Sequence, residues 1–336
     1  MPVANAVSPP RVTTDPLVAL LRQIRPAPQG VPVSLWEAAL IGPVAEFLNR
    51  PGKRLRGRLV SLGWSLAGRD NDLPPELPLL VELLHAGSLV VDDIEDDSIQ
   101  RRGRAALHRL IGVPAALNIG NWLYFWPQTL LKDLDLPVET ELDLHRLWAD
   151  AVRVCHEGQA LDLTARIGDL HPTDVISVCR VVSEWKTGTL MGMAAELGAT
   201  AAGGDADTIA AVRTFGIRVG VGLQMQNDLG ELTGAAGPIK HPEDLVHGRI
   251  TWPWAWAAER LPAAKFDALQ IRGAKLAAGS GDAAVLARDL LAALGPDPVG
   301  SVRAALSEAY RDLAIAVGAH PAMAEVQGEL DRLIRS

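Results

Sequence analysis

The sequence predicts an all-α fold, built as a single-domain helical bundle. Apolar residues recur at helical spacing along most of the chain, and the alternating pattern of half-buried strands is scarce. Residues 76–97, ELPLLVELLHAGSLVVDDIEDD, are apolar nearly all round until their acidic end, which places this helix in the centre of the bundle. Of the 336 residues, 48% are hydrophobic, which is ample for one large core.

The helices can be placed in order along the chain. The first runs over residues 15–25, with Asp15 as its N-cap and Pro16 in the first turn. About a dozen helices are expected, the longer ones over residues 114–132, 138–167, 173–202 and 205–232, and shorter ones to Ile334. Residues 1–14 contain prolines and no long apolar run, so we expect a flexible tail and not a signal peptide, followed by one helical domain over residues 15–336.

Composition argues against several classes of protein. The formal net charge is −8, whereas nucleic-acid binding needs a basic face, so no nucleic-acid partner is expected. No run of about 18 apolar residues is present, so no transmembrane segment is expected. Cys155 and Cys179 have no pairing motif and are expected to be buried thiols of a cytoplasmic protein.

An acidic run interrupts the apolar helix in the stretch VVDDIEDDSIQRRG. Asp92, Asp93 and Asp96 form a D-D-x-x-D pattern, and residues three and four apart share a helix face. Like charges at this spacing, close to a helix C-terminus, destabilise the helix. A Mg²⁺ ion would remove the conflict, because it prefers carboxylate and phosphate oxygens. The alternative is a solvated acidic surface, although the preceding residues 87–91 have the composition of a core.

Two arginines follow the acidic run. Arg101 and Arg102 would lie too far round to share the face of Asp92 if the helix continued, so the chain must bend between Ser98 and Gly103. Guanidinium groups match phosphate oxygens with paired hydrogen bonds. Magnesium ligands and arginines side by side therefore predict a diphosphate site.

Further polar groups interrupt apolar helices elsewhere. In QMQNDLGE, residues 224–231, the pairs Asn227 with Glu231 and Gln224 with Asp228 are each four residues apart and offer oxygens on one helix. The alternative is a set of satisfied core polar groups. Cations stand out in three places, each of which alone is more typical of a solvated stripe: Lys53 and Arg56 in PGKRLRGR, Lys186 before Thr187 in SEWKTGTLMG, and Lys240.

Taken in order, these motifs resemble the trans-isoprenyl diphosphate synthases of the polyprenyl synthetase family, and most of all its geranylgeranyl diphosphate synthases. The resemblance runs from about Gly52 to Pro253. It is carried by GKRLR, LLHAGSLVVDDIEDDSIQRRG, NIGNWLYFW, HEGQALD, WKTGTL, LQMQNDLGE and EDLVHGRITWP. It implies the helical fold of the isoprenoid synthases with its central apolar cavity, a homodimer, and Mg²⁺ as cofactor. The implied reaction condenses isopentenyl diphosphate with an allylic prenyl diphosphate.

The resemblance also implies roles for single residues. Asp92 and Asp96 would ligate magnesium on the allylic diphosphate, supported by Asp93, and Arg101, Lys186 and Lys240 would contact that diphosphate. Isopentenyl diphosphate would be held by Lys53, Arg56, His85 and Arg102. Thr187 and Gln224 would place oxygens near the carbocation, and Gln159 and Asp162 occupy the family's G-Q-x-x-D positions.

The second acidic motif departs from the family pattern, which is usually D-D-x-x-D. Here Asn227 and Glu231 take its first and last positions as expected magnesium ligands, and an amide oxygen lacks the full charge of a carboxylate. We expect weaker metal binding from this change. The departure also leaves open a class I terpene cyclase on the same fold, although the intact set Lys53, Arg56 and His85 argues for a second diphosphate.

Two further classes of protein fit part of the sequence. One is a non-catalytic subunit that modulates a prenyl synthase, and the other is a di-iron bundle, for which Glu82 and His85 supply only one E-x-x-H pair. GIRVGVG, residues 216–222, has no preceding strand and is not expected to bind a nucleotide.

Product length is expected to depend on the wall below Asp92. The resemblance places Gly87 and Ser88 on this wall, where small residues leave room for a longer chain. We therefore expect a twenty-carbon product. Trp122, Phe125 and Trp126 are candidates for the floor of this space, although a tryptophan-rich helix is more often part of a core.

Overall fold

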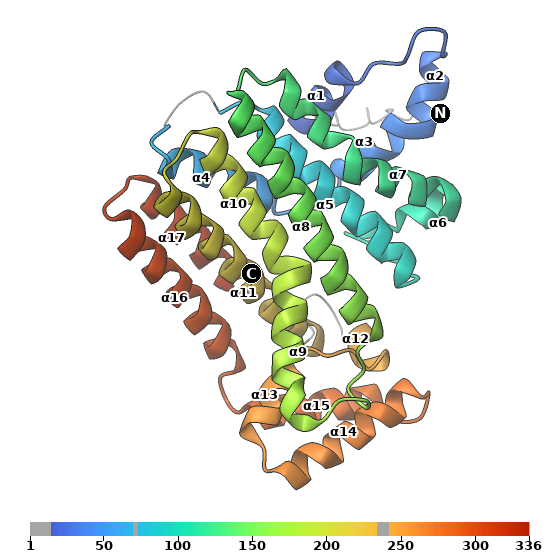
Figure 1. Cartoon of the computed structure of the whole chain (residues 1–336). Coiled ribbons are helices and arrows are strands. Elements are labelled where there is room, and N and C mark those ends of the chain that lie inside the picture. The colour runs from blue at the N-terminus through green and yellow to red at the C-terminus, as the bar shows by residue number, and fades with distance from the viewer. Residues whose placement is uncertain (1–14, 70–72, 234–241, 336) are drawn as a thin grey trace, which may run out of the picture. The chain divides into compact units, whose positions relative to one another are not determined.

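The computed structural model describes residues 15–69, 73–233 and 242–335, and it confirms the all-α fold (Figure 1). The described residues hold seventeen α-helical segments, more than the dozen expected, and of the longer predicted helices the one over residues 173–202 is divided into two by a π turn. The chain forms two compact units, one of Met1–Arg54 with Leu79–Thr129 and one of Leu55–Pro78 with Leu130–Ser336. A single domain over residues 15–336, with one central cavity, stays a prediction.

The first unit contains short N-terminal helices, most of one long helix and a small hairpin. Asp15 caps the first helix, because its Oδ1 accepts a hydrogen bond from the backbone N of Leu17 at 2.9 Å. This helix packs on α3 and buries Val18 and Leu21 completely. The elements are α1 (Pro16–Ile24), α2 (Val33–Trp36), the π turn η1 (Glu37–Ile41), α3 (Gly42–Leu48), α5 (Glu76–Glu95), β1 (Gln100–Arg101), β2 (Arg104–Ala105), α6 (Leu107–Ile111) and α7 (Val113–Phe125).

Helices α5 and α7 approach each other through glycines. A Cβ on Gly87 of α5 would lie 2.7 Å from the Cβ of Leu123, and one on Gly120 of α7 would lie 2.6 Å from Cγ2 of Val91. Any larger side chain at these two positions would push the helices apart. Gly87 therefore faces α7, while Ser88, the next residue, is half-buried and donates its hydroxyl to the carbonyl oxygen of His85.

The second unit is the larger one and consists of helices and their connecting turns. Its α10 packs against α4, α8 and α11, and α11 packs also against α16. The elements are α4 (Leu55–Leu66), the 3₁₀ turn η2 (Pro127–Asp133), which begins in the first unit, α8 (Val138–Thr164), η3 (Pro172–Asp174), α9 (Val175–Val182), the π turn η4 (Ser183–Gly188), α10 (Thr189–Ala201), α11 (Ala206–Thr233), α12 (Glu243–Val246), α13 (Trp252–Arg260), α14 (Ala263–Ala277), α15 (Ala283–Leu294), α16 (Pro298–Val317) and α17 (Ala322–Arg335).

The crossing of α4 and α10 in the second unit is especially close. A Cβ on Gly63 of α4 would lie 2.0 Å from the carbonyl oxygen of Ala195, and one on Gly198 of α10 would lie 1.9 Å from that of Val60. Each helix thus presses its backbone into a glycine of the other. The sequence predicted one helix over residues 173–202, and the structure divides it at η4, where the N–H of Thr189 donates to the carbonyl oxygen of Glu184, five residues back.

The described residues bear on two expectations, the absence of a transmembrane segment and the state of the cysteines. No helix among them is long and apolar enough to cross a membrane. Both cysteines are free thiols, Cys179 buried and Cys155 partly exposed. Desolvation raises the pKa of Cys155 to about 12 and that of Cys179 well above its usual range, so both are poor nucleophiles.

Candidate active site

The acidic end of α5 lies in the first unit beside the hairpin of β1 and β2. Asp92 and Asp96 are one helical turn apart and half-buried, and Asp93 is fully buried. Burial raises the pKa of Asp93 even though the guanidinium of Arg101 opposes the shift. One carboxylate oxygen of Asp93, Oδ2, is buried without a hydrogen-bond partner in this structure. The backbone N of Asp96 donates to the carbonyl oxygen of Asp92 at 2.9 Å, so the two residues keep helical spacing, and their role as metal ligands stays a prediction.

The predicted bend after Ser98 is a tight β-hairpin. Gln100 pairs with Ala105 and Arg101 with Arg104, which leaves Arg102 and Gly103 as the two central residues of the turn. Both have positive φ angles, 52° and 76°, as a type I′ hairpin turn requires. The hairpin returns Arg101 to the acidic helix end, where its Nη2 lies 2.5 Å from Oδ1 of Asp93 and 3.4 Å from Oδ2 of Asp92.

Arg102 occupies the other side of the hairpin. Its guanidinium lies 5.7 Å from the ring centre of Phe47, and a Cβ on Gly52 would come within 2.9 Å of its Nη1. The glycine of the basic motif therefore leaves room for this arginine. Desolvation lowers the pKa of Arg102 despite the nearby carboxylate of Glu82. A buried cation of this kind gains from a bound anion.

The residues of the basic motif belong to different units of the structure. Lys53 is exposed and His85 half-buried in the first unit, whereas Arg56 stands in α4 of the second unit. The convergence of these residues with Arg102 on one diphosphate therefore stays a prediction. Arg54 is turned elsewhere, because its guanidinium forms an ion pair with Asp15 and donates to the carbonyl oxygen of Leu48 at 2.8 Å.

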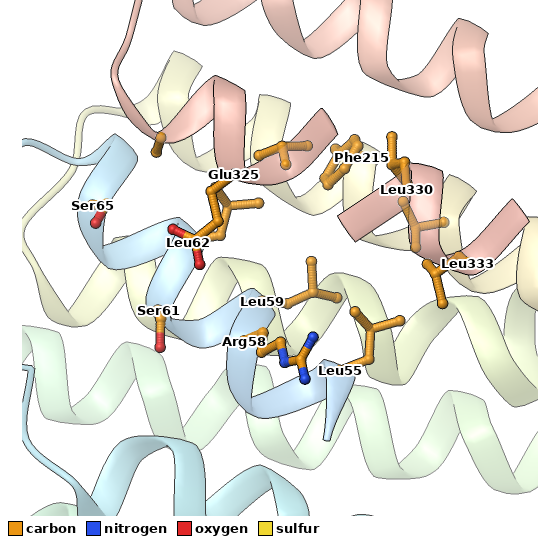
Figure 2. Close-up of a pocket in the computed structure, with 13 residues that line it drawn as sticks. Leu55, Arg58, Leu59, Ser61, Leu62, Ser65, Phe215, Glu325, Leu330 and Leu333 are labelled. Carbon is orange, nitrogen blue, oxygen red and sulfur yellow. The ribbon is translucent and has the colours of Figure 1, made fainter. Parts of the chain in front are cut away.

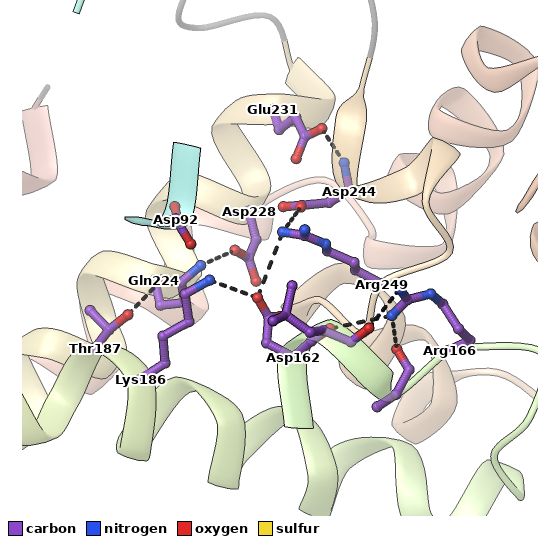
Figure 3. A network of polar contacts seen from close by, with 12 residues as sticks. Asp92, Asp162, Arg166, Lys186, Thr187, Gln224, Asp228, Glu231, Asp244 and Arg249 are labelled. Atoms are coloured by element: carbon purple, nitrogen blue, oxygen red, sulfur yellow. Dashed lines mark hydrogen bonds and ion pairs between the residues drawn. The ribbon is translucent and has the colours of Figure 1, made fainter. Parts of the chain in front are cut away.

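In the second unit, Lys186 and Arg249 both face Asp162 (Figure 3). The Nζ of Lys186 lies 2.7 Å from Oδ2 of Asp162, and Nη1 of Arg249 lies 3.6 Å from the same oxygen. α8 and η4 can bring these groups together because a Cβ on Gly158 would lie only 2.6 Å from the backbone N of Lys186. Lys240, the third predicted allylic contact, lies outside the described residues.

A second chain of hydrogen bonds fixes the side chain of Gln224. Its Oε1 accepts from Oγ1 of Thr187 at 2.9 Å, and its Nε2 donates to Oδ1 of Asp228 at 2.7 Å. The other oxygen of Asp228 accepts from the backbone N of Trp252, whose indole N–H donates to Oγ of Ser183. Ser183 and Thr187 both belong to η4, so the chain closes on itself. Thr187 and Gln224 are thus brought together as predicted. Both carboxylate oxygens of Asp228 accept hydrogen bonds in this chain, and one of these bonds orients Gln224.

The acidic side chains of the second motif lie close to Asp244, with too few cations beside them to balance their negative charge. Asn227 is exposed on α11, and Oε1 of Glu231 accepts from the backbone N of Asp244 at 2.9 Å. Burial is the main cause that raises the pKa of Asp228 to about 7, and burial with the neighbouring Asp244 raises the pKa of Glu231 as well. A bound cation would offset this excess of negative charge, so the donor chemistry suits Mg²⁺.

Metal ligation by side chains alone is limited in this chain. Within the described ranges, no three His, Cys, Asp or Glu side chains are placed to hold a metal ion together. Magnesium would therefore take further ligands from water and from phosphate oxygens, as it does at many phosphoryl sites. The same finding leaves the di-iron bundle without a ligand set in the part of the chain that the structure describes.

Several residues that build the site were not predicted from the sequence. Asp244 and Arg249 lie in EDLVHGRITWP, and Nη1 of Arg249 is 3.4 Å from Oδ1 of Asp244. Their spacing of five residues across a turn gives no helical signal, although a lone cation in this apolar segment could have drawn attention. Ser183 and Trp252 are 69 positions apart, and nothing in the sequence connects them.

An apolar pocket lies apart from these polar networks in the second unit (Figure 2). Leucines of α4 and α17 point into the space between the two helices, and Phe215 of α11 contributes to its lining. The pocket encloses about 550 Å³ including open solvent, and Arg58 and Glu325 are among its lining residues. It contains none of the predicted site residues.

The fold and the site define a class of all-α proteins in which an acidic helix end lies against an arginine, here Arg101. The chain belongs to the polyprenyl synthetase family, whose model matches residues 37–278. It is 30% identical over 213 residues to a geranylgeranyl pyrophosphate synthase of Penicillium janthinellum, which covers 63% of this chain and 56% of the relative. It is 31% identical over 225 residues to a geranylgeranyl pyrophosphate synthase of Geoglobus acetivorans, with 66% and 67% covered.

Solved structures share the fold. A decaprenyl diphosphate synthase from Rhodobacter capsulatus superposes with a TM-score of 0.78 at 22% identity, covering 95% of this chain and 94% of that one. A polyprenyl synthase from Caulobacter crescentus, in complex with calcium and isoprenyl diphosphate, gives 0.73 at 25% identity, with 94% and 92% covered. The prediction of an isoprenoid-synthase fold is therefore confirmed. In sequence, however, the match spans only 56% of the length of the Penicillium relative.

Proposed function

We propose that this protein is a trans-prenyltransferase that condenses isopentenyl diphosphate with an allylic prenyl diphosphate, with geranylgeranyl diphosphate as the product. The observation that carries the proposal is the acidic end of α5, where Asp92 and Asp93 lie against Arg101 while Asp96 extends the same helix face. The family membership and the named relatives support it.

The residues divide the reaction between them. Asp92, Asp96, Asn227 and Glu231 would hold Mg²⁺, which when bound stabilises negative charge on a departing diphosphate. Arg101, Lys186 and Arg249 would neutralise the same diphosphate as its bond to the allylic carbon breaks. The hydroxyl of Thr187 and the amide oxygen of Gln224, locked by Asp228, would face the allylic cation. Isopentenyl diphosphate would be held by Lys53, Arg56, His85 and Arg102. Its double bond would attack that cation, and the condensed product would then lose a proton.

A direct assay tests the proposal. The purified chain is incubated with Mg²⁺, isopentenyl diphosphate and allylic diphosphates of several lengths, and the products are identified by mass. Chain elongation that stops with metal chelation is expected. Hydrocarbons formed from an allylic diphosphate alone would instead indicate a terpene cyclase, and activity that requires a second protein would indicate a modulating subunit.

A homodimer is part of the proposal. Four large apolar side chains of α6 and α7 are exposed in the single chain: Leu110, Val113, Leu117 and Phe125. Exposed apolar residues that gather on neighbouring helices mark surfaces that a second protein can cover.

The replacement Ser88→Phe should shorten the product. Ser88 is half-buried and its hydroxyl donates to the carbonyl oxygen of His85 on its own helix, so replacing it breaks no tertiary hydrogen bond. An aromatic ring here would fill space that the growing chain is proposed to use. Leu89→Phe, about 100° further round the helix, is the matched control. Product lengths measured by mass that stay the same in Ser88→Phe would refute this placement.

The replacement Asn227→Asp should lower the Mg²⁺ concentration that gives half-maximal activity by about fivefold, because a carboxylate adds a full charge to the metal site. Asn227 is exposed, so its replacement should leave the unfolding midpoint unchanged. Ser280→Asp adds the same charge at an exposed turn and should not alter the metal dependence. Equal magnesium titrations for wild type and Asn227→Asp would remove Asn227 from the ligand set.

A further inference from the structure

The hairpin of β1 and β2 needs outside support. Each strand has two residues, which is too short for an isolated hairpin to be stable in water. Its turn also holds Arg102 at a φ of 52°, a conformation that costs free energy for most residues other than glycine, asparagine and aspartate. Yet this hairpin presents both Arg101 and Arg102, which the proposed function assigns to two different diphosphates. Their geometry therefore depends on whatever holds the turn in place.

Arg50, which follows α3, supplies this support. Its side chain is completely buried, and its Nη1 donates to the carbonyl oxygen of Arg101 at 3.1 Å. Its Nη2 donates to the carbonyl oxygen of Ala105 at 3.0 Å, so one guanidinium binds both strands of the hairpin. Hydrogen bonds from a charged group to buried carbonyls are among the stronger ones in proteins.

The guanidinium of Arg50 is itself held from the side of α3. Its Nη2 lies 2.7 Å from Oε2 of Glu46, and its Nε donates to the same carboxylate. Its carbon centre lies 5.1 Å from the ring centre of Phe47, the ring that Arg102 also covers. All three nitrogens of Arg50 are therefore used within the protein, and none is accessible to a substrate.

We propose that Arg50 is a positioning residue that fixes the hairpin so that Arg101 faces the carboxylates of α5 while Arg102 faces Gly52 and Phe47. The proposal rests on the proposed function for its link to diphosphate binding. It rests on the contacts of Arg50 alone for its effect on the hairpin.

The test compares Arg50→Gln with Arg104→Gln. Arg104 binds the same Glu46 at 3.1 Å but is 58% exposed and bonds to neither hairpin carbonyl through its side chain, which makes it a matched control. Backbone hydrogen exchange of residues 100–106 should become about tenfold faster in Arg50→Gln, since at least one charged hydrogen bond is lost, and stay unchanged in Arg104→Gln. Exchange in α7 should change in neither.

The second readout is kinetic. In Arg50→Gln the KM values for both diphosphate substrates should rise about tenfold, with a smaller change in kcat, because binding geometry and not chemistry is disturbed. If Arg50→Gln does not fold, Arg50→Lys keeps the charge beside Glu46 but lacks the planar fork that places one nitrogen at each carbonyl, and it should show the same changes in smaller degree. Unchanged hairpin exchange, uniformly faster exchange throughout the first unit, or unchanged KM values with a loosened hairpin would each overturn the proposal.

If the wild-type chain forms no prenyl product, the proposed function has failed. Backbone hydrogen exchange of residues 100–106 then still decides whether Arg50 holds the hairpin. The affinity for inorganic pyrophosphate with Mg²⁺, measured by calorimetry, replaces KM and should weaken about tenfold in Arg50→Gln. Equal affinities in the two proteins would overturn the positioning role independently.

Discussion

Asp92→Asn should lower kcat by at least about a hundredfold, because removing one group that stabilises developing charge in a closed site typically costs that much or more. Asparagine keeps the shape of the side chain but loses the full charge that Mg²⁺ needs. The fold should survive, since Arg101 keeps its closer partner Asp93 at 2.5 Å, against 3.4 Å for Asp92. Steady-state kinetics at several magnesium concentrations, with unfolding midpoints measured alongside, test this expectation.

Asp97→Asn is the matched control for this variant. Asp97 belongs to the same acidic run, but its side chain is 83% exposed and pairs with Arg109. Its φ of 52° suits asparagine as well as aspartate, so the exchange should not strain the backbone. Asp97→Asn should therefore keep kcat within about twofold of the wild type, a difference below about 0.5 kcal/mol. An Asp92→Asn enzyme as active as Asp97→Asn would exclude Asp92 from the catalytic site.

Gly63→Ala should destabilise the protein by about 3 kcal/mol or more, the upper range for overpacking a core. The new methyl group would lie 2.0 Å from the carbonyl oxygen of Ala195 and 2.9 Å from the backbone N of Ala199. Backbone atoms cannot move aside as a flexible side chain can, so α4 and α10 must separate. Urea unfolding followed by circular dichroism measures the loss as a lower midpoint with a similar slope.

A second glycine provides the comparison for this stability effect. Gly230 is also inside a helix, α11, but a Cβ there would meet no heavy atom within 4 Å. Gly230→Ala should leave the free energy of unfolding unchanged or raise it by up to about 1 kcal/mol, because alanine favours the helix. Similar midpoints for Gly63→Ala and Gly230→Ala would mean that α4 and α10 do not cross as closely as described.

Much of the fold could be predicted from local patterns. The N-cap at Asp15 and the bounds of α5, α8 and α11 follow from capping residues and helical periodicity, which depend on near neighbours only. The bend that returns Arg101 to Asp92 could be inferred as well, because a continuous helix would have separated them. Gln224 and Thr187 meet as the family resemblance implied.

The remaining features depend on contacts that a sequence does not display. Arg50 looks like a solvated cation until the hairpin that it binds is in place, 51 and 55 positions further along. Arg54, inside the basic motif, adopts a positive φ and pairs with Asp15, which lies 39 positions earlier. The division of residues 173–202 at η4 arises from packing against α8 and α11, which overrides a continuous helical pattern.

The π turn η4 makes the length of this segment adjustable by one residue. Its hydrogen bond from Thr189 to Glu184 spans five residues, where an α-helix would span four. Deleting one residue there would restore regular α winding and leave the rest of α10 in place, because the π turn accommodates the extra residue within the path of the helix. Gly192 and Gly198 would therefore keep the faces on which they accommodate Ile217 and Val60. A one-residue gap inside α10 would instead rotate the helix beyond it by about 100°, so single-residue gaps in related chains should fall within residues 183–188 and not within α10.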